Sequence, residues 1–262
     1  MTEQAAEFLQ IGVGDDARDI ALIHRHATSQ PDAPMLVWLG GYRSDMTGTK
    51  AVELDRFAAE NGLACLRLDY SGHGASGGDF KRGTISRWLE EAIAVVRAKS
   101  SSRVVLIGSS MGGWIALRMV EELRKGDGAP SVAGLVLIAP APDFTAELIE
   151  PSLTDAEKTS LLEKGYFEEH SEYSPEPNIF TRALMEDGRQ NRVLQGIITT
   201  GCPVHILQGM RDPDVPYQHA LKLVEHLPAD DVVLTLIRDG DHRLSRPQDI
   251  DRMLAAVKTL AI

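Results

Sequence analysis

The chain has 262 residues, a formal net charge of −11 and 43% hydrophobic residues. This length fits one large α/β domain, and the hydrophobic fraction excludes a disordered chain. The acidic balance argues against nucleic acid and anionic membrane surfaces as main partners, and no run approaches the roughly 18 consecutive apolar residues of a membrane span. Residues 1–10 lack the basic start and apolar core of a signal peptide or transit segment, so a cytoplasmic location is expected.

Short apolar runs recur along the chain, at residues 8–14, 20–27, 34–40, 63–70, 103–108, 132–140, 203–209 and 231–239. Their lengths and β-branched content predict strands. A turn-like segment joins the first two runs, which indicates an antiparallel hairpin. From residue 34 onward the runs alternate with helical patterns near 50–61, 84–99, 111–125, 217–227 and 247–260. The pattern predicts an α/β fold with a mostly parallel eight-stranded sheet, an antiparallel N-terminal hairpin and helices on both faces.

One long segment interrupts this alternation. Residues 141–200 contain no strong strand signal and show helical stretches near 155–165 and 191–198. A long excursion inside a compact domain usually serves function, and ligands of open α/β sheets bind at the carboxyl ends of the strands. We therefore expect a single domain over residues 1–262, with 141–200 forming a small helical lid. The alternative is a passive surface insertion.

The strongest chemical signal is the sequence Gly108-Ser109-Ser110-Met111-Gly112, a G-x-S-x-G pattern. It follows a predicted strand directly and opens a predicted helix, which is the context this motif requires. Glycines two residues either side of Ser110 permit a sharp turn that presents its hydroxyl at the helix N-terminus. The motif predicts Ser110 as a nucleophile, with the Met111 N–H as one oxyanion donor. The alternative is a structural Gly-Ser turn.

A serine nucleophile needs a base and an acid, which in this arrangement follow it in the order Ser, acid, His. Asp212 follows the predicted strand at 203–209, and His242 follows the one at 231–239. We expect His242 to act as general base and then general acid, with Asp212 orienting it. Asp214 is the competing acid, and Asp212 is favoured because it lies closer to the strand end. The sequence has no H-E-x-x-H or C-x-x-C pattern, so no metal or other cofactor is expected.

Two glycine-rich loops follow earlier strands. In Leu39-Gly40-Gly41-Tyr42 the small residues let the backbone approach a substrate carbonyl, and the Tyr42 N–H is the preferred second oxyanion donor. An ordinary tight turn is the alternative there. In the segment DYSGHGASGG, residues 69–78, the glycines are expected to shape the loop, with Asp69 and His73 in supporting positions.

The blocks LGGYRSDMTGTKA, DYSGHGASGG, GSSMGGW, LQGMRDPDVP and DHRL together resemble the α/β-hydrolase superfamily. More narrowly, they resemble the α/β-hydrolase domain-containing protein 10 group, whose animal members are described as mitochondrial acyl-protein thioesterases and acyl-glucuronide esterases. The resemblance implies that Ser110, Asp212 and His242 occupy the nucleophile, acid and base positions.

The sequence thus predicts a hydrolase of carboxylic esters or thioesters that works through an acyl-enzyme on a small-molecule or acyl-protein substrate. The candidate substrate-binding residues are Gly41, Arg43 and Arg243. Arg43 follows the loop that carries the Tyr42 N–H and Arg243 follows His242, so the two arginines would attract an anionic leaving group such as a glucuronate. Two solvated surface arginines are the alternative. A serine peptidase and a non-catalytic binding module on the same scaffold remain the rival functions. The sequence does not indicate an oligomeric state.

Overall fold

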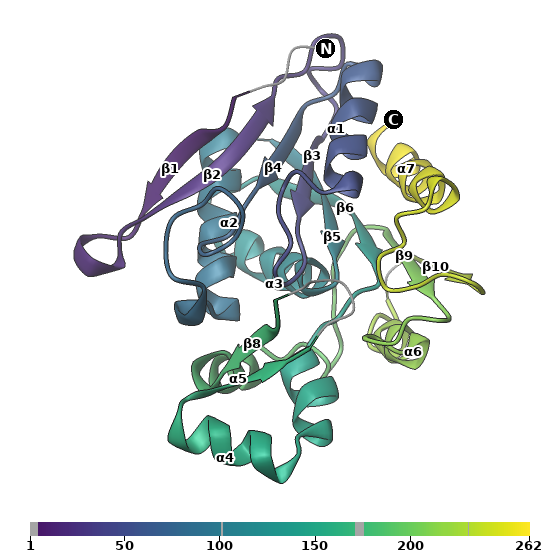
Figure 1. The fold of residues 1–262 in the computed structure, drawn as a ribbon. Helices are drawn as coiled ribbons and strands as arrows, with labels where there is room; N and C mark the ends of the chain where they lie inside the picture. Colours follow the sequence, from purple (N-terminus) through teal and green to yellow (C-terminus); the bar gives the residue numbers. More distant parts are fainter. Residues whose placement is uncertain (1–4, 101, 171–175, 230) are drawn as a thin grey trace.

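In the computed structural model, which describes residues 5–100, 102–170, 176–229 and 231–262, an eight-stranded sheet runs through the middle of the molecule (Figure 1). Its strand order is β1-β2-β4-β3-β5-β6-β9-β10. The strands are β1 (Glu7–Ile11), β2 (Arg18–Arg25), β3 (Met35–Leu39), β4 (Cys65–Leu68), β5 (Arg103–Ser109), β6 (Ser131–Ile138), β9 (Val204–Gly209) and β10 (Val232–Ile237).

The pairing is antiparallel at the start of the chain and parallel afterwards. β1 pairs with β2 in a hairpin whose register places Leu9 opposite Ile20, and β2 then pairs antiparallel with β4. Every later pair, from β4–β3 to β9–β10, is parallel. The predicted mostly parallel sheet with an antiparallel N-terminal hairpin is therefore confirmed. Parallel strands bring the carboxyl ends of β3, β5, β9 and β10 to the same edge of the sheet.

Helices cover both faces of the sheet, as predicted. They are α1 (Thr49–Asn61), α2 (Ile85–Lys99), α3 (Met111–Lys125), α6 (Tyr217–Glu225) and α7 (Pro247–Ala261). Leu36 and Trp38 of β3 belong to the core that includes α1 and α7, whereas Val37 and Leu39 belong to the core that includes α2, α3 and α6. Side chains alternate between the faces of a strand, so a continuous apolar run serves both layers.

The insertion between β6 and β9 forms a separate group of elements beside the carboxyl ends of the strands (Figure 1). It contains a turn of π-helix (Thr145–Ile149), a 3-10 turn (Glu150–Ser152), α4 (Asp155–Glu163), β7 (Tyr166–Glu169), β8 (Asn178–Thr181) and α5 (Arg182–Gln190). β7 and β8 pair antiparallel as a two-stranded sheet. We call the described residues of 141–200 the cap.

Two expectations for the cap were wrong. The segment contains two strands where none was expected, because each is only four residues long and they pair with each other rather than with the main sheet. The helix expected at 191–198 is absent, and α5 ends before it. Val193, Leu194 and Ile198 are buried in an irregular segment, where the Asp143 carboxylate accepts the N–H groups of Val193 and Leu194 at 2.8 and 2.9 Å. A buried carboxylate thus replaces the hydrogen bonds that a helix would have supplied.

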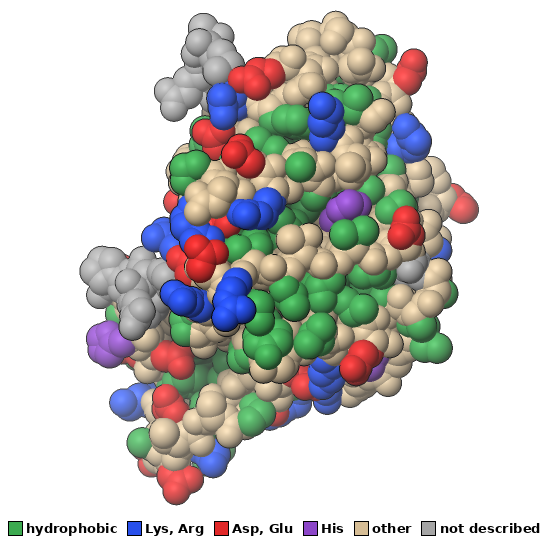
Figure 2. Space-filling model, turned by 90° about the vertical axis from the view of Figure 1, so that its right-hand side faces the viewer, with side chains coloured by type: hydrophobic (Ala, Val, Ile, Leu, Met, Phe, Trp, Pro, Cys, Tyr) green, Lys and Arg blue, Asp and Glu red, His purple; other side chains and the backbone are tan. Residues whose placement is uncertain are grey.

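The edge strand β10 carries partly exposed apolar side chains. Val233 and Leu236 are 44% and 39% exposed. Figure 2 views the molecule from the side of β10, α6 and α7, and shows hydrophobic side chains gathered between scattered charged ones. In the described part of the chain, no helix is both long and apolar enough to cross a membrane.

A buried ion pair joins the N-terminal hairpin to α2. The side chains of Arg18 on β2 and Glu91 on α2 are both fully buried, and the guanidinium donates to the carboxylate. The other carboxylate oxygen of Glu91 accepts the Ser71 N–H at 2.8 Å, which ties the loop after β4 to the same pair. Arg18 also pairs with Glu90, whose side chain is 58% exposed.

We expect Glu91→Gln to lower the free energy of unfolding by about 3 kcal/mol, because it leaves the buried guanidinium without its buried counter-charge. Glu90→Gln removes an exposed partner of the same arginine and should cost less than about 1 kcal/mol. Urea unfolding followed by circular dichroism measures both values. An equal loss of unfolding free energy in the two variants would show that burial of the partner does not determine how strongly Arg18 is stabilised.

Candidate active site

Ser110 lies at the junction between β5, which ends at Ser109, and α3, which begins at Met111. Its backbone has φ +53° and ψ −118°, a conformation that a residue with a side chain rarely adopts. Three backbone hydrogen bonds hold it there: the Ser110 N–H donates to the Ile138 carbonyl at 2.9 Å, and the Ser110 carbonyl accepts from Gly113 at 2.9 Å and from Ala141 at 3.1 Å. Strand β6 and the start of the cap therefore stabilise the strained turn.

Glycines make the close packing of this turn possible. A Cβ atom on Gly108 would lie 2.4 Å from the Gly112 carbonyl oxygen, so the two ends of the turn touch backbone to backbone. A Cβ atom on Gly112 would lie 2.1 Å from the Leu39 oxygen and 2.7 Å from the Gly40 oxygen. The G-x-S-x-G pattern therefore sharpens the turn and also seats it directly against the loop after β3.

The side chains of Asp212, His242 and Ser110 form a chain of hydrogen bonds. His242 Nδ1 lies 2.8 Å from Asp212 Oδ2, and His242 Nε2 lies 3.1 Å from Ser110 Oγ. An ionised carboxylate only accepts hydrogen bonds, so we assign the imidazole proton to Nδ1. Nε2 then presents a lone pair to the Ser110 hydroxyl, which is the arrangement that a general base requires.

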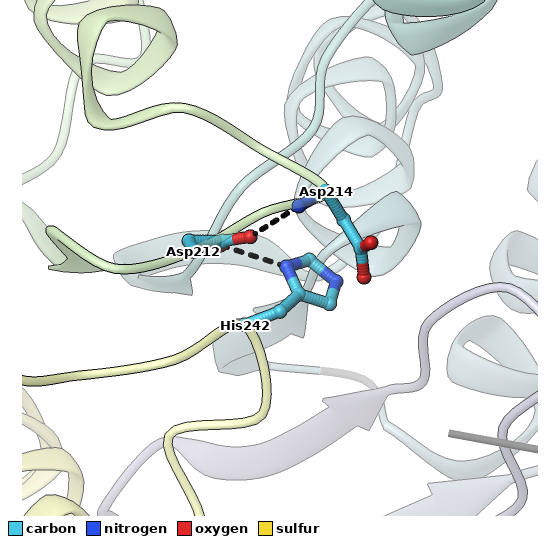
Figure 3. A group of neighbouring side chains, drawn as sticks. All are labelled: Asp212, Asp214 and His242. Atoms are coloured by element: carbon cyan, nitrogen blue, oxygen red, sulfur yellow. Dashed lines mark hydrogen bonds and ion pairs between the residues drawn. The ribbon is translucent and has the colours of Figure 1, made fainter. Parts of the chain in front are cut away.

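The two candidate acids, Asp212 and Asp214, lie close together beside His242. Figure 3 shows Asp212 and Asp214 on the loop after β9, with His242 reaching them from the loop after β10. The imidazole is hydrogen-bonded to Asp212 at 2.8 Å, and an Asp214 carboxylate oxygen lies within 4.8 Å of one ligand atom of each of these two residues. The Asp214 backbone N–H donates to Asp212 Oδ1 at 2.9 Å. In this geometry Asp214 supports Asp212.

Four donors hold the buried carboxylate of Asp212. Oδ1 accepts the N–H groups of Asp214 and of Val215, the latter at 2.8 Å, while Oδ2 accepts from His242 and from Gln208 Nε2 at 3.1 Å. Gln208 is fully buried, and its amide also donates to the Val215 carbonyl at 3.0 Å. Gln208 is not predictable from the sequence, because nothing about a strand residue before Gly209 shows that its side chain faces Asp212.

The loop after β3 approaches Ser110 closely. A Cβ atom on Gly41 would lie 3.2 Å from the Ser109 oxygen and 3.3 Å from Ser110 Cβ, so a larger residue would crowd the hydroxyl. Met111 is the first residue of α3, where the backbone N–H has no acceptor within its own helix. The backbone of Gly41–Tyr42 and the N-terminus of α3 thus border the Ser110 side chain, which is where oxyanion donors are needed.

The Tyr42 side chain contacts the cap, so only the backbone of Tyr42 is available as an oxyanion donor. Its hydroxyl donates to the Ile179 carbonyl, and its ring stacks on Phe180 with centroids 5.2 Å apart. Phe80 and Trp88 approach the same ring edge-on, at 5.1 and 5.9 Å. Burial raises the pKa of the Tyr42 hydroxyl far above its usual range, so it stays protonated and serves as an anchor.

The two candidate substrate-binding arginines are placed differently. The Arg43 guanidinium donates to the Pro177 carbonyl, pairs with Glu176 at 2.7 Å and lies over the Phe80 ring. It borders a cavity of about 390 Å³ between the cap and the loop after β4. Arg243 is exposed, and its carbonyl accepts from Lys50, whose pKa burial lowers to about 8. Binding of an anionic leaving group by these arginines stays a prediction.

Within the described ranges, Asp212, Asp214 and His242 are the group of potential ligands close enough to share a metal ion, with one atom of each within 4.8 Å of the others. Asp212 and His242 already use these atoms for the hydrogen bonds to each other and to Ser110. The donor set is therefore explained without a metal, and chemistry without a cofactor stays a prediction.

Comparison with known proteins identifies the family of this chain. A model of the Alpha/beta hydrolase family matches residues 35–256. The chain belongs to this family. A putative hydrolase from Agrobacterium vitis S4 is 65% identical, with each chain covered completely and a TM-score of 0.96. Alpha/beta hydrolase domain-containing protein 10 from mouse is 26% identical over 98% of both chains, with a TM-score of 0.83.

A curated relative carries a more specific name. The palmitoyl-protein thioesterase ABHD10, mitochondrial, of Homo sapiens is 27% identical over 229 residues, which cover 87% of this chain and 73% of the human one. The resemblance to the α/β-hydrolase superfamily and to the domain-containing protein 10 group is thus confirmed. The chain is a member of a hydrolase family with thioesterase relatives.

We expect Gly112→Ala to lower the free energy of unfolding by about 3 kcal/mol, because the new methyl group would collide with backbone oxygens that cannot rotate away. Gly196→Ala is a suitable control, since a Cβ atom there meets nothing within 4 Å. Thermal or urea unfolding compares the two variants. A Gly112→Ala protein as stable as the control would contradict the close contact between the turn and the loop after β3.

Proposed function

We propose that this protein hydrolyses carboxylic esters or thioesters through a covalent acyl-enzyme on Ser110. The observation that carries the proposal is the continuous hydrogen-bond chain from Asp212 through His242 to Ser110. The membership of the alpha/beta hydrolase family supports it. The name of the human relative favours acyl thioesters, including protein-bound acyl groups, within that class.

In the proposed first step, His242 Nε2 takes the Ser110 hydroxyl proton as Oγ attacks the acyl carbonyl. The carbonyl electron pair moves onto oxygen, and the N–H groups of Tyr42 and Met111 stabilise the resulting oxyanion. When the tetrahedral intermediate collapses, the bond to the alcohol or thiol breaks. The leaving group receives the proton from His242, whose positive charge Asp212 stabilises in the meantime.

Deacylation repeats these steps with water as the nucleophile. His242 accepts a water proton, the hydroxide adds to the acyl carbon, and the ester bond to Ser110 breaks with return of the proton to Oγ. The products are a carboxylic acid and the regenerated hydroxyl. Each step uses the same three side chains, so loss of any one of them should affect both halves of the reaction.

Two rival functions predict different behaviour. A non-catalytic binding module on this scaffold has no need for an activated serine, yet the Ser110 hydroxyl is hydrogen-bonded to an oriented imidazole. A serine peptidase would use the same triad and would cleave peptide amides. An ester, thioester and peptide panel therefore separates the peptidase from the esterase, and serine labelling separates either from the binding module.

A labelled fluorophosphonate should form one adduct with the wild-type protein, and Ser110→Ala should abolish it and reduce ester turnover at least ~10³-fold. Ser109→Ala, one residue away in the same motif, is the matched control and should keep the adduct. Intact-mass spectrometry measures the adduct, and p-nitrophenyl esters, acyl thioesters and acyl glucuronides measure turnover. Near-normal turnover in Ser110→Ala would rule out the nucleophile.

Asp212→Asn should reduce kcat by about 10³–10⁴-fold, because an amide can donate to Nδ1 and stabilise the wrong imidazole tautomer. Asp214→Asn retains the backbone N–H that supports Asp212 and should stay within about tenfold of wild type. Steady-state kinetics on one ester compares the pair. A larger loss in Asp214→Asn than in Asp212→Asn would reverse the assignment of the acid.

A further inference from the structure

His73 is a buried histidine that the proposed reaction leaves unused. It lies in the loop after β4 and is only 3% exposed. Aromatic rings surround it, with the centroids of Tyr70, Phe80 and Trp88 at 5.7, 5.1 and 5.2 Å. Such packing allows the imidazole one orientation, so the directions of its two nitrogen atoms are determined.

Both ring nitrogens of His73 are engaged, and their partners determine the tautomer. The backbone N–H of Arg43 donates to Nε2 at 3.2 Å, and Nδ1 lies 3.1 Å from the Ser71 carbonyl oxygen. A backbone N–H can only donate and a carbonyl can only accept, so Nε2 is unprotonated and Nδ1 carries the hydrogen. Burial lowers the pKa of His73 to about 4, so at neutral pH the ring remains the neutral acceptor that Arg43 requires.

The hydrogen bond from Arg43 to His73 is important because Arg43 lies in the loop after β3, next to the proposed oxyanion donor Tyr42. Arg43 follows Tyr42 directly and has φ +57°, a conformation that a residue other than glycine adopts at a cost. On the other side of Tyr42, the Gly41 carbonyl accepts the Ser44 N–H at 3.1 Å. The two peptide planes that flank the Tyr42 Cα atom are therefore each held by one hydrogen bond. The Tyr42 N–H lies in the first of these planes along the chain, and the second plane, held by His73, fixes the Tyr42 Cα atom to which the first is joined.

The loop that carries His73 is held by further hydrogen bonds besides the one that Nδ1 donates to the Ser71 carbonyl. The Asp69 carboxylate accepts the Met46 N–H at 2.6 Å and the Ala75 N–H at 2.8 Å. Gly72 donates to the Gly77 carbonyl at 3.0 Å, which closes the loop through its backbone. Nε2, in contrast, contacts a different loop, where it accepts the backbone N–H of Arg43.

We propose that His73 is a positioning residue, which fixes the backbone of Arg43 and thereby aims the Tyr42 N–H at the oxygen of the reacting acyl group. The inference rests on the proposed function, because it assigns the Tyr42 N–H as an oxyanion donor. His73 itself touches neither the nucleophile nor the substrate carbonyl in this mechanism. Its contribution is geometric and takes effect in the transition state.

The test compares two replacements at this position. His73→Phe keeps the ring packing and removes the acceptor, so kcat should fall ~10–100-fold with KM changed less than about threefold. His73→Gln retains a carbonyl oxygen that can accept from Arg43, and should recover most of that loss. His205→Phe, at the amino end of β9, is the control for loss of a partly buried histidine. His73→Leu replaces His73→Phe if the latter does not fold.

A second readout separates positioning from a general loss of structure. A trifluoromethyl ketone adds to the serine and forms an oxyanion at the same place as the reacting carbonyl, so its affinity should fall in His73→Phe in parallel with kcat/KM. The melting temperatures of the Phe and Gln variants provide the comparison of stability. Parallel losses of kcat and of ketone affinity, with recovery in His73→Gln, are the expected result.

Three results would overturn the inference. One is a His73→Phe protein that keeps kcat within about threefold of wild type, since misplacing a donor should cost more. Another is a His73→Gln protein that loses as much kcat as His73→Phe. The third is an unchanged ketone affinity in His73→Phe despite a reduced kcat. Absence of turnover in the wild-type protein would overturn the proposed function as well, whereas these three results leave that function intact.

Discussion

The whole site depends on a contact between backbone atoms of three elements: the end of β3, the end of β5 and the start of α3. Gly112 lies so close to the Leu39 and Gly40 carbonyls that no side chain fits between them. Because this contact is rigid, the strained Ser110 and the loop before Tyr42 are positioned as one unit. Ser110 and the backbone N–H groups nearest to it therefore cannot shift independently of each other.

Around this rigid centre, the polar side chains are oriented by partners of their own. Asp212 accepts hydrogen bonds from two backbone N–H groups and from the Gln208 amide, in addition to the one from His242. The loop after β4 is held by Asp69 and by the buried pair of Arg18 and Glu91. Each of these interactions reduces the freedom of a group to which we assign a part in the proposed reaction, so that little reorganisation would be left for the reaction itself.

The sequence predicts local features well and long-range ones poorly. The turn at Ser110 was predictable, because strand, glycines and helix are contiguous, and parallel strands were expected to bring Asp212 and His242 to the same edge. The choice between Asp212 and Asp214 rested only on closeness to the strand end, because two residues on one loop look alike until the loop's own hydrogen bonds are known. Gln208 lies on β9, and its contact with Asp212 also depends on how the following loop folds back over the strand end. The helix expected at 191–198 does not form, because the carboxylate of Asp143, about 50 residues away, binds the backbone N–H groups of Val193 and Leu194. A contact so distant in the sequence overrides the local helical preference.

The aromatic residues at the base of the cap have a consequence for how the molecule can be observed. Trp88 packs against Tyr42, and the indole N–H of Trp114 donates to the carbonyl of Asn191 in the cap. Indole emission responds to the polarity and hydrogen bonding of its surroundings. Trp114, which contacts the cap directly, and Trp88, which contacts it through Tyr42, thus give the protein an intrinsic optical signal for the position of the cap, without any added label.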